Sequence, residues 1–127
     1  MANSKIFDIA RKYKSLGLVN STDFLLQPAL AVELLHDLTE IGVRVVGCDS
    51  WRYLDREKKD PTRILELVGG GTGAEFPFEI SIDENARIIE EFLVNKLPED
   101  VDLISLIVDD PQIPVPFSYL IRDIDEA

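Results

Sequence analysis

Hydrophobic residues recur at helical spacing near the start of the chain and again from Pro28. The first stretch follows the i, i+3, i+4, i+7 pattern and stops at Gly17. The second stretch stops at Gly42, a residue that suits the left-handed end of a helix, and Pro28 suits its start. The pattern therefore predicts two helices that each bury one face. Their apolar stripes are Ile6, Ile9, Ala10, Tyr13 and Leu16 in the first helix, and Leu30, Leu34, Leu38 and Ile41 in the second.

A third helical pattern begins at Ser81, which forms an S-x-x-E capping box with Glu84. Arg87 lies four residues from both Asp83 and Glu91, and this spacing predicts ion pairs on the exposed face of the helix. The third helix should also bury one face. Its apolar stripe is Ile82, Ala86, Ile89, Phe92 and Leu93.

The chain after Gly42 predicts a strand and then a turn. Val43–Val46 is mostly β-branched, which is typical of a buried strand. Gly47 indicates a bulge or a close backbone approach at the end of this strand. We expect the chain to turn at Gly47, Cys48 and Asp49 and to leave the turn as a second strand.

Further strand-like runs follow this turn. Trp51–Leu54 and Arg63–Val68 flank a long charged connection, and we expect them to form a hairpin. Leu103–Val108 is apolar at every position except Ser105, which indicates a central strand covered by helices on at least one side. Strands and helices thus alternate irregularly along the chain, as they do in α+β proteins.

The remaining segments are expected to be connections. Asn20–Asp23 is a polar link, and Gly69–Gly73, GGGTG, would lose too much backbone entropy in a regular element. The glycine run invites a phosphate-binding interpretation, but no Lys-Ser, Lys-Thr or helix start follows it, so a flexible connection is favoured. The prolines within residues 111–116 predict an irregular or edge segment, and the acidic residues within 122–127 predict a frayed C-terminus.

These elements predict an α+β fold in a single domain, residues 1–127, with about three helices packed on an antiparallel or mixed sheet of about four strands. A chain of 127 residues suits one hydrophobic core. Residues on the apolar stripes should occupy this core. We expect burial of Leu34, Leu38, Val45, Ile89, Phe92 and Ile107.

Charge narrows the set of partners. Acidic residues outnumber basic ones by 24 to 13, which gives a net charge of -11. This charge would repel nucleic acid and anionic membranes and would attract a basic protein. No apolar run is long enough to span a membrane, and the N-terminus does not resemble a signal peptide. With a single cysteine in addition, the chain is expected to be cytoplasmic.

Candidate chemistry is sparse. Cys48 and His36 are the only thiol and the only imidazole, so a cysteine hydrolase would need them adjacent. His36, however, lies on the polar face of the second helix, whereas Cys48 follows a buried strand, which favours a small core cysteine over catalysis. One histidine and one cysteine cannot build a zinc site alone, and Asp109-Asp110 lacks the spacing of a calcium loop. We therefore expect no catalytic residue, no metal site and no cofactor.

Two groups of residues suggest a protein-binding surface. The exposed face of the second helix is acidic, and around Trp51 aromatic and acidic residues alternate so that they share one face of a strand. Aromatic side chains anchor partners, and carboxylates steer basic ones. The alternative is a hairpin whose Trp51 folds into the core. The candidate contact residues are Glu33, Asp37, Glu40, Asp49, Trp51, Tyr53 and Asp55, with Glu84, Glu90 and Glu91 of the third helix as the next candidates.

The order of these features carries a family resemblance. A leucine-rich helix from Pro28 to Ile41 runs into a hydrophobic strand that ends at Asp49, and a hairpin with Trp51 follows. The Ser81–Glu84 capping box and the strand Leu103–Val108 come next. This order resembles a family of bacterial immunity proteins, numbered forty among the partners of polymorphic and contact-dependent toxins. The resemblance implies an inhibitor that binds a cognate toxin domain in the producing cell and has no catalysis of its own.

We therefore expect an acidic interaction protein, an immunity protein that binds and neutralises a cognate basic toxin domain. One alternative is a small cytosolic enzyme that uses Cys48 in the manner of a cysteine hydrolase. The other is a generic acidic binding module.

Overall fold

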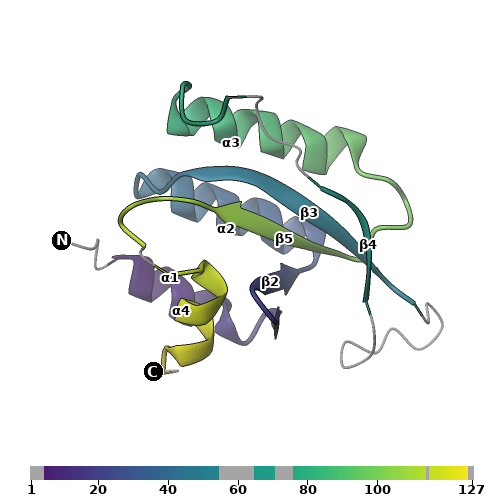
Figure 1. The fold of residues 1–127 in the computed structure, drawn as a ribbon, viewed down its shortest axis with the longest axis horizontal. Coiled ribbons are helices and arrows are strands. Elements are labelled where there is room, and N and C mark those ends of the chain that lie inside the picture. Colours follow the sequence, from purple (N-terminus) through teal and green to yellow (C-terminus); the bar gives the residue numbers. More distant parts are fainter. Residues whose placement is uncertain (1–4, 55–64, 71–75, 114, 126–127) are drawn as a thin grey trace.

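The centre of the fold is an antiparallel β-sheet (Figure 1). The structure, a computed structural model, describes residues 5–54, 65–70, 76–113 and 115–125. These residues contain five strands, in the order β1-β2-β5-β3-β4, and four α-helices. The α+β fold is confirmed, with one more helix and one more strand than expected. The elements are α1 (Lys5–Lys14), β1 (Leu18–Asn20), β2 (Asp23–Leu26), α2 (Pro28–Glu40), β3 (Val45–Tyr53), β4 (Leu65–Gly70), α3 (Ile82–Glu91), the π-helical turn η1 (Phe92–Lys96), β5 (Leu103–Val108) and α4 (Phe117–Asp123).

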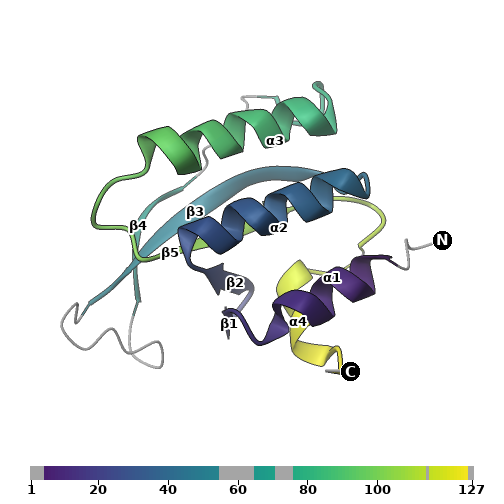
Figure 2. The same cartoon turned by 180° about the vertical axis from the view of Figure 1, so that it is seen from behind.

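The helices cover only one face of the central strands. α2 and α3 pack on the same side of β3 and β5, and Figure 2 shows α2 in front of these strands. Figure 1, from the opposite side, shows no helix of the described residues in front of β3 and β5. α1 and α4 pack against each other, and α4 also packs against β2. The described helices therefore cover one side of β3 and β5 and leave the other side without a helix over it.

The register of β3 and β5 decides which side chains lie on each face. Ser50 pairs with Ile104 across the ladder, and Cys48 pairs with Leu106. Cys48 and Ile104 belong to the core that the leucines of α2 fill, so these pairs face the helices. Successive side chains on a strand point to opposite faces. The alternating pairs, Asp49 with Ser105 and Trp51 with Leu103, therefore lie on the uncovered face.

β3 runs without a break from Val45 to Tyr53, so the turn predicted at Gly47, Cys48 and Asp49 is wrong. One long strand forms because β5 pairs with it along most of its length. The bulge predicted near Gly47 is confirmed, since the register with β5 shifts between Val45 and Gly47.

The predicted hairpin between the Trp51 region and the Arg63 region is confirmed as the antiparallel pair β3–β4. β4 begins at Leu65, and Arg63 lies outside the described residues. The prediction of a loop over Gly69–Gly73 is wrong for Gly69 and Gly70, because both belong to β4 and pair with β3. Residues 71–73 lie outside the described part.

The polar link over residues 20–23 and the C-terminal tail after the prolines contain regular structure that was not predicted. Residues 20–23 form the tight turn of a β1–β2 hairpin, in which Asn20 pairs with Asp23 and Ser21 has a positive φ of 57°. After the prolines, the chain forms α4, so the predicted fraying over 122–127 is wrong for Arg122 and Asp123. Pro116 stands at the N-cap of α4, where a fixed φ and a missing N–H are tolerated. Residues 126–127 lie outside the described part.

The third helix begins as predicted. The Ser81 side chain accepts a hydrogen bond from the backbone N–H of Glu84, with 3.0 Å between Oγ and N, so this half of the capping box forms. The predicted ion pairs differ, because Arg87 pairs with Glu84 one turn before it rather than with Asp83 or Glu91.

The core lies between the sheet and the helices. Leu34, Leu38, Val45 and Ile89 are buried as expected, and Phe92 packs against the core while only partly buried. The prediction for Ile107 is wrong, because its side chain is 37% exposed. Ile107 pairs with Gly47 on the uncovered face of β5, where no described helix lies over it.

Candidate protein-binding surface

The uncovered face of the sheet combines apolar and acidic side chains. We call it the open sheet face. Register places Leu67 of β4 opposite Trp51 of β3, and Trp51 opposite Leu103 of β5. Leu67 is 53% exposed and Trp51 is half-buried. The residues that define the open sheet face are Asp23, Asp49, Trp51, Leu67, Leu103, Ser105 and Ile107.

A chain of hydrogen bonds fixes the side chains at the middle of this face. The indole Nε1 of Trp51 donates to the hydroxyl oxygen of Ser105 over 3.1 Å. The Ser105 hydroxyl in turn donates to a carboxylate oxygen of Asp23 over 3.4 Å. Ser105 itself is buried, so its hydroxyl needs these partners. Strands β3, β5 and β2 are thereby linked through side chains as well as through the sheet ladder.

Asp49 lies beside this chain in an unfavourable electrostatic setting. Partial burial raises the pKa of the Asp49 carboxyl above its ordinary value, and the nearby Asp23 carboxylate raises this pKa further. Neither Asp23 nor Asp49 forms an ion pair with any residue in the described part of the chain. Two carboxylates therefore share the open sheet face without a described cation between them.

A hollow of about 460 Å³ borders both carboxylates. The ladder between β2 and β5 holds only the pairs Leu25–Ser105 and Leu26–Ile104, so the strands separate toward Asp23. Asp109 and Asp110 also line the hollow, together with apolar side chains from β5, from the following loop and from the start of α4. The apolar side chains are Leu106, Ile107, Val108, Ile113, Val115 and Phe117, together with Phe24 of β2.

The helical candidates lie elsewhere and are already paired. Lys12 of α1 contacts Glu33 at 3.0 Å and Asp37 at 2.9 Å between Nζ and the carboxylate oxygens. The Tyr13 hydroxyl also donates to Asp37, over 2.6 Å. Although burial alone would raise the pKa of Asp37, the hydrogen bonds from Tyr13 and Lys12 bring it below its ordinary value. These carboxylates stabilise the contact between α1 and α2.

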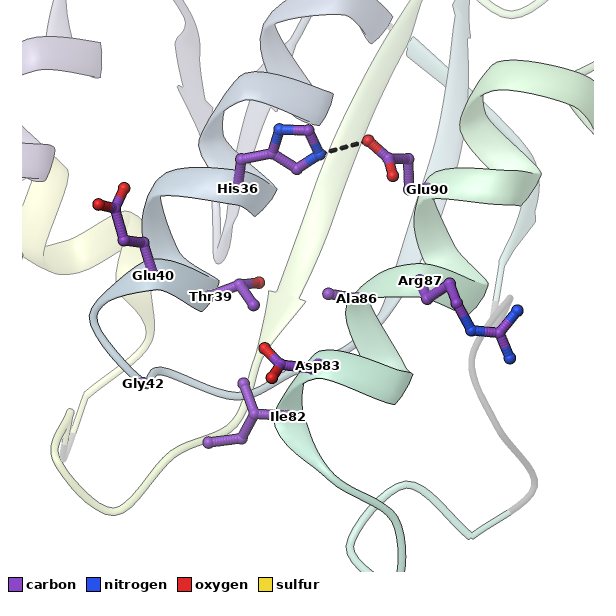
Figure 3. A pocket seen from close by; sticks show the side chains of 9 residues that line it. All are labelled: His36, Thr39, Glu40, Gly42, Ile82, Asp83, Ala86, Arg87 and Glu90. Carbon is purple, nitrogen blue, oxygen red and sulfur yellow. Dashed lines mark hydrogen bonds and ion pairs between the residues drawn. The ribbon is translucent and has the colours of Figure 1, made fainter.

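Glu40 borders a groove of about 620 Å³ between α2 and α3 (Figure 3). His36 and Glu90 point toward each other across this groove and form a hydrogen bond, whereas Glu40 points away from α3 (Figure 3). Of the other carboxylates on the third helix, Glu84 pairs with Arg87 and Glu91 pairs with Lys96.

The candidate contact residues do not form one continuous surface. Glu33 and Asp37 face α1, whereas Asp49 and Trp51 lie on the opposite side of the sheet from α2. Tyr53, two residues after Trp51 in β3, lies on the same strand face as Trp51, as predicted, and borders a further hollow with Pro28 at the start of α2. Asp55 lies outside the described residues. Sequence reasoning also missed Asp23, Leu67, Ser105 and Ile107, which only the strand register places beside Trp51.

Cys48 and His36 occupy different environments. Cys48 is 0% exposed in the core, as the sequence indicated, and the His36 side chain is 59% exposed on α2. Within the described ranges, no group of three or more His, Cys, Asp or Glu side chains is arranged to hold a metal ion. In the same ranges, no helix is long and apolar enough to cross a bilayer.

Comparison with known proteins gives no relative. No protein-family model matches the chain, and no curated protein or solved structure gives a significant match.

Proposed function

We propose that this protein is an acidic interaction protein that binds and neutralises a basic protein partner. In the immunity family that the sequence resembles, that partner is a bacterial toxin domain. The protein then acts in the cytoplasm of the producing cell and works by occupying its partner, without a cofactor, nucleic acid or membrane. The net charge of -11 supports a basic partner, because opposite charge accelerates encounter between proteins.

The observation that carries the proposal is the distribution of this charge. Eight of the lysine and arginine residues that the structure describes have partners within the chain. Acidic side chains such as half-buried Asp49 are therefore left without a described cation. The eight are Arg11 with Asp8, Lys12 with Glu33 and Asp37, Lys14 and Arg44 with main-chain carbonyls, Arg52 with Glu66 and Asp100, Arg87 with Glu84, Lys96 with Glu91, and Arg122 with Asp123.

The second candidate function, a cysteine hydrolase, has less support. A nucleophilic thiolate needs access to substrate and a nearby base. Cys48 is 0% exposed, and the exposed His36 imidazole contacts Glu90 of α3. A Cys48→Ser variant separates the two functions, because it should leave partner binding intact. Loss of all activity by a correctly folded Cys48→Ser protein would favour the hydrolase.

The direct test takes any basic, toxin-like domain that proves to be encoded next to the gene for this protein. Its activity is measured with and without this protein, and the affinity of the pair is measured by calorimetry at low and at physiological ionic strength. We expect a stoichiometric complex, loss of the toxin activity, and an affinity that weakens as salt rises. A toxin domain that stays fully active at saturating concentrations of this protein would refute the proposed function.

A further inference from the structure

The open sheet face exposes apolar side chains on three adjacent strands. Leu67 of β4 is 53% exposed and Ile107 of β5 is 37% exposed, and half-buried Trp51 of β3 lies between these strands. By contrast, the leucines that α2 turns toward the sheet, such as Leu35 and Leu38, are 0% exposed. Single exposed hydrophobic residues are common, but exposed apolar side chains on one face of neighbouring strands are typical of a contact surface. Trp51 pairs directly with Leu67, and Ile107 lies two same-face residue pairs further along the β3–β5 ladder. We call these three side chains the apolar row.

The charge of this face decides what kind of partner fits it. Asp49 pairs with Ser105, between the Trp51–Leu103 pair and the Gly47–Ile107 pair of the ladder, and the Ser105 hydroxyl donates to Asp23. Partial burial and then the Asp23 carboxylate raise the pKa of Asp49. A guanidinium or ammonium group from outside the chain would relieve this repulsion and supply the cation that the described residues do not. The indole of Trp51 adds a ring face on which an arginine can stack.

Other occupants fit the same face poorly. A second copy of this chain would bring another net charge of -11 and the same pair of carboxylates. Nucleic acid would bring phosphates toward Asp23 and Asp49. A basic protein complements both the charge and the apolar row.

We propose that the open sheet face is the docking surface for a basic protein, whose arginine or lysine side chains lie against Asp23 and Asp49 and whose apolar side chains cover Trp51, Leu67 and Ile107. This inference rests on the proposed function and adds the surface that performs it. It also assigns Glu33 and Asp37 to the packing of α1 on α2, where Lys12 already neutralises them.

The sole tryptophan of the chain makes this surface directly observable. The probe is a synthetic amphipathic peptide, free of tryptophan, that carries leucine and arginine on one helix face. A matched peptide with glutamate in place of arginine is the control. Docking of the arginine peptide should shift the Trp51 emission and protect the indole from acrylamide quenching, and the glutamate peptide should do neither. Unchanged Trp51 emission at saturating arginine peptide would overturn the proposed surface.

Paired variants locate the contact. Leu67→Lys places a like charge in the apolar row and should weaken peptide binding about tenfold. Val94→Lys, at a 63% exposed position of η1 on the helical side, makes the same charge change and should leave the affinity within about twofold of the parent. Asp49→Asn should weaken binding about two- to fivefold, whereas Glu40→Gln on α2 should have a smaller effect. Equal losses of affinity for Leu67→Lys and Val94→Lys, or for Asp49→Asn and Glu40→Gln, would overturn the proposed docking surface.

The outcomes also separate this inference from the proposed function. If the arginine peptide binds and the Leu67→Lys variant does not, but the toxin-like domain stays active, the docking surface stands and the proposed function fails. If the toxin-like domain is neutralised equally well by the parent and by Leu67→Lys, with unchanged Trp51 emission, the proposed function stands and the docking surface is wrong. Circular dichroism of each variant checks that the fold is intact.

Discussion

Two acidic regions of this protein use the same type of side chain in opposite ways. On the helical side, Asp37 accepts hydrogen bonds from Lys12 and Tyr13, which bring its pKa below the ordinary value against the effect of burial. On the open sheet face, partial burial and the Asp23 carboxylate raise the pKa of Asp49. The first carboxylate therefore stabilises the fold in its ionised form, whereas the second destabilises it.

This contrast teaches how to separate structural acids from acids available to a partner. Both regions contribute to the same net charge, so composition alone cannot distinguish them. A carboxylate that has gained a cation within the chain offers little to a partner, because its charge is already compensated locally. A carboxylate held near another carboxylate would be stabilised by a cation from a partner. The pH dependence of stability should therefore have opposite signs in the two regions.

The largest difference is expected between the leucines of the two regions. Leu38→Ala, in the core beneath α2, should lower the free energy of unfolding by about 2 to 5 kcal/mol, because it removes buried contacts and leaves a cavity. Leu67→Ala, on the open sheet face, should lower it by less than about 1 kcal/mol. Urea denaturation of both variants measures these values. Equal losses would mean that the open sheet face is covered within the folded chain.

A smaller effect is expected for Asp37→Ala. At neutral pH this change should lower the free energy of unfolding by about 1 to 3 kcal/mol, because it removes a charged acceptor and leaves the Tyr13 hydroxyl without it. A carboxyl with a lowered folded-state pKa stabilises above its unfolded pKa and loses that contribution as pH falls through the folded value. The difference from the parent should therefore shrink in acid. Glu40→Ala, on the same helix, is the control and should change stability very little.

The smallest effect has the opposite sign. Asp49→Asn should raise the free energy of unfolding at neutral pH by less than about 1 kcal/mol, because it removes the charge that burial and Asp23 oppose. A carboxyl with a raised folded-state pKa stabilises fully below its unfolded pKa, and this contribution is lost as pH rises through the raised value. The advantage of asparagine should therefore disappear as pH falls and the parent's Asp49 takes up its proton. Destabilisation by Asp49→Asn at neutral pH would contradict the contrast between the regions.

The helices α2 and α3 could be predicted from the sequence because the spacing of their apolar residues agrees with the residues that begin and end them. Leu34 and Leu38 mark the buried stripe of α2, and the Ser81 cap fixes the start of α3. The β1–β2 hairpin was missed because its tight turn places Ser21, not glycine or asparagine, at a positive φ. α4 was missed because Phe117, Tyr119 and Ile121 alternate like a strand, whereas prolines shortly before a helix mark its start as readily as they mark an irregular segment.

The candidate surface was harder to predict than the fold. Asp49, Trp51 and Tyr53 were correctly singled out as sharing a strand face, because that inference needs only the period of a strand. Their neighbours come from β2, β4 and β5, and strand order and register are long-range properties that no local signal fixes here. The assignment of Glu33 and Asp37 to the same surface depended on adjacency along the chain. The sheet separates Glu33 and Asp37 from Trp51. Lys12 of α1 neutralises the charge of both carboxylates.

The hydrogen bond from Trp51 to Ser105 has a consequence for the entropy of recognition. An exposed tryptophan normally loses rotamer freedom when a partner immobilises it, and this loss weakens binding. Here the indole is already held by β5, whose hydroxyl is held by β2, so the anchor is ordered before any partner arrives. The single N–H donor of the ring is also occupied, which leaves the flat π surface as what the ring presents. Because the Trp51 ring is already ordered and offers no free hydrogen-bond donor, it can pack against different partner side chains. Discrimination between partners then depends on the carboxylates around the ring.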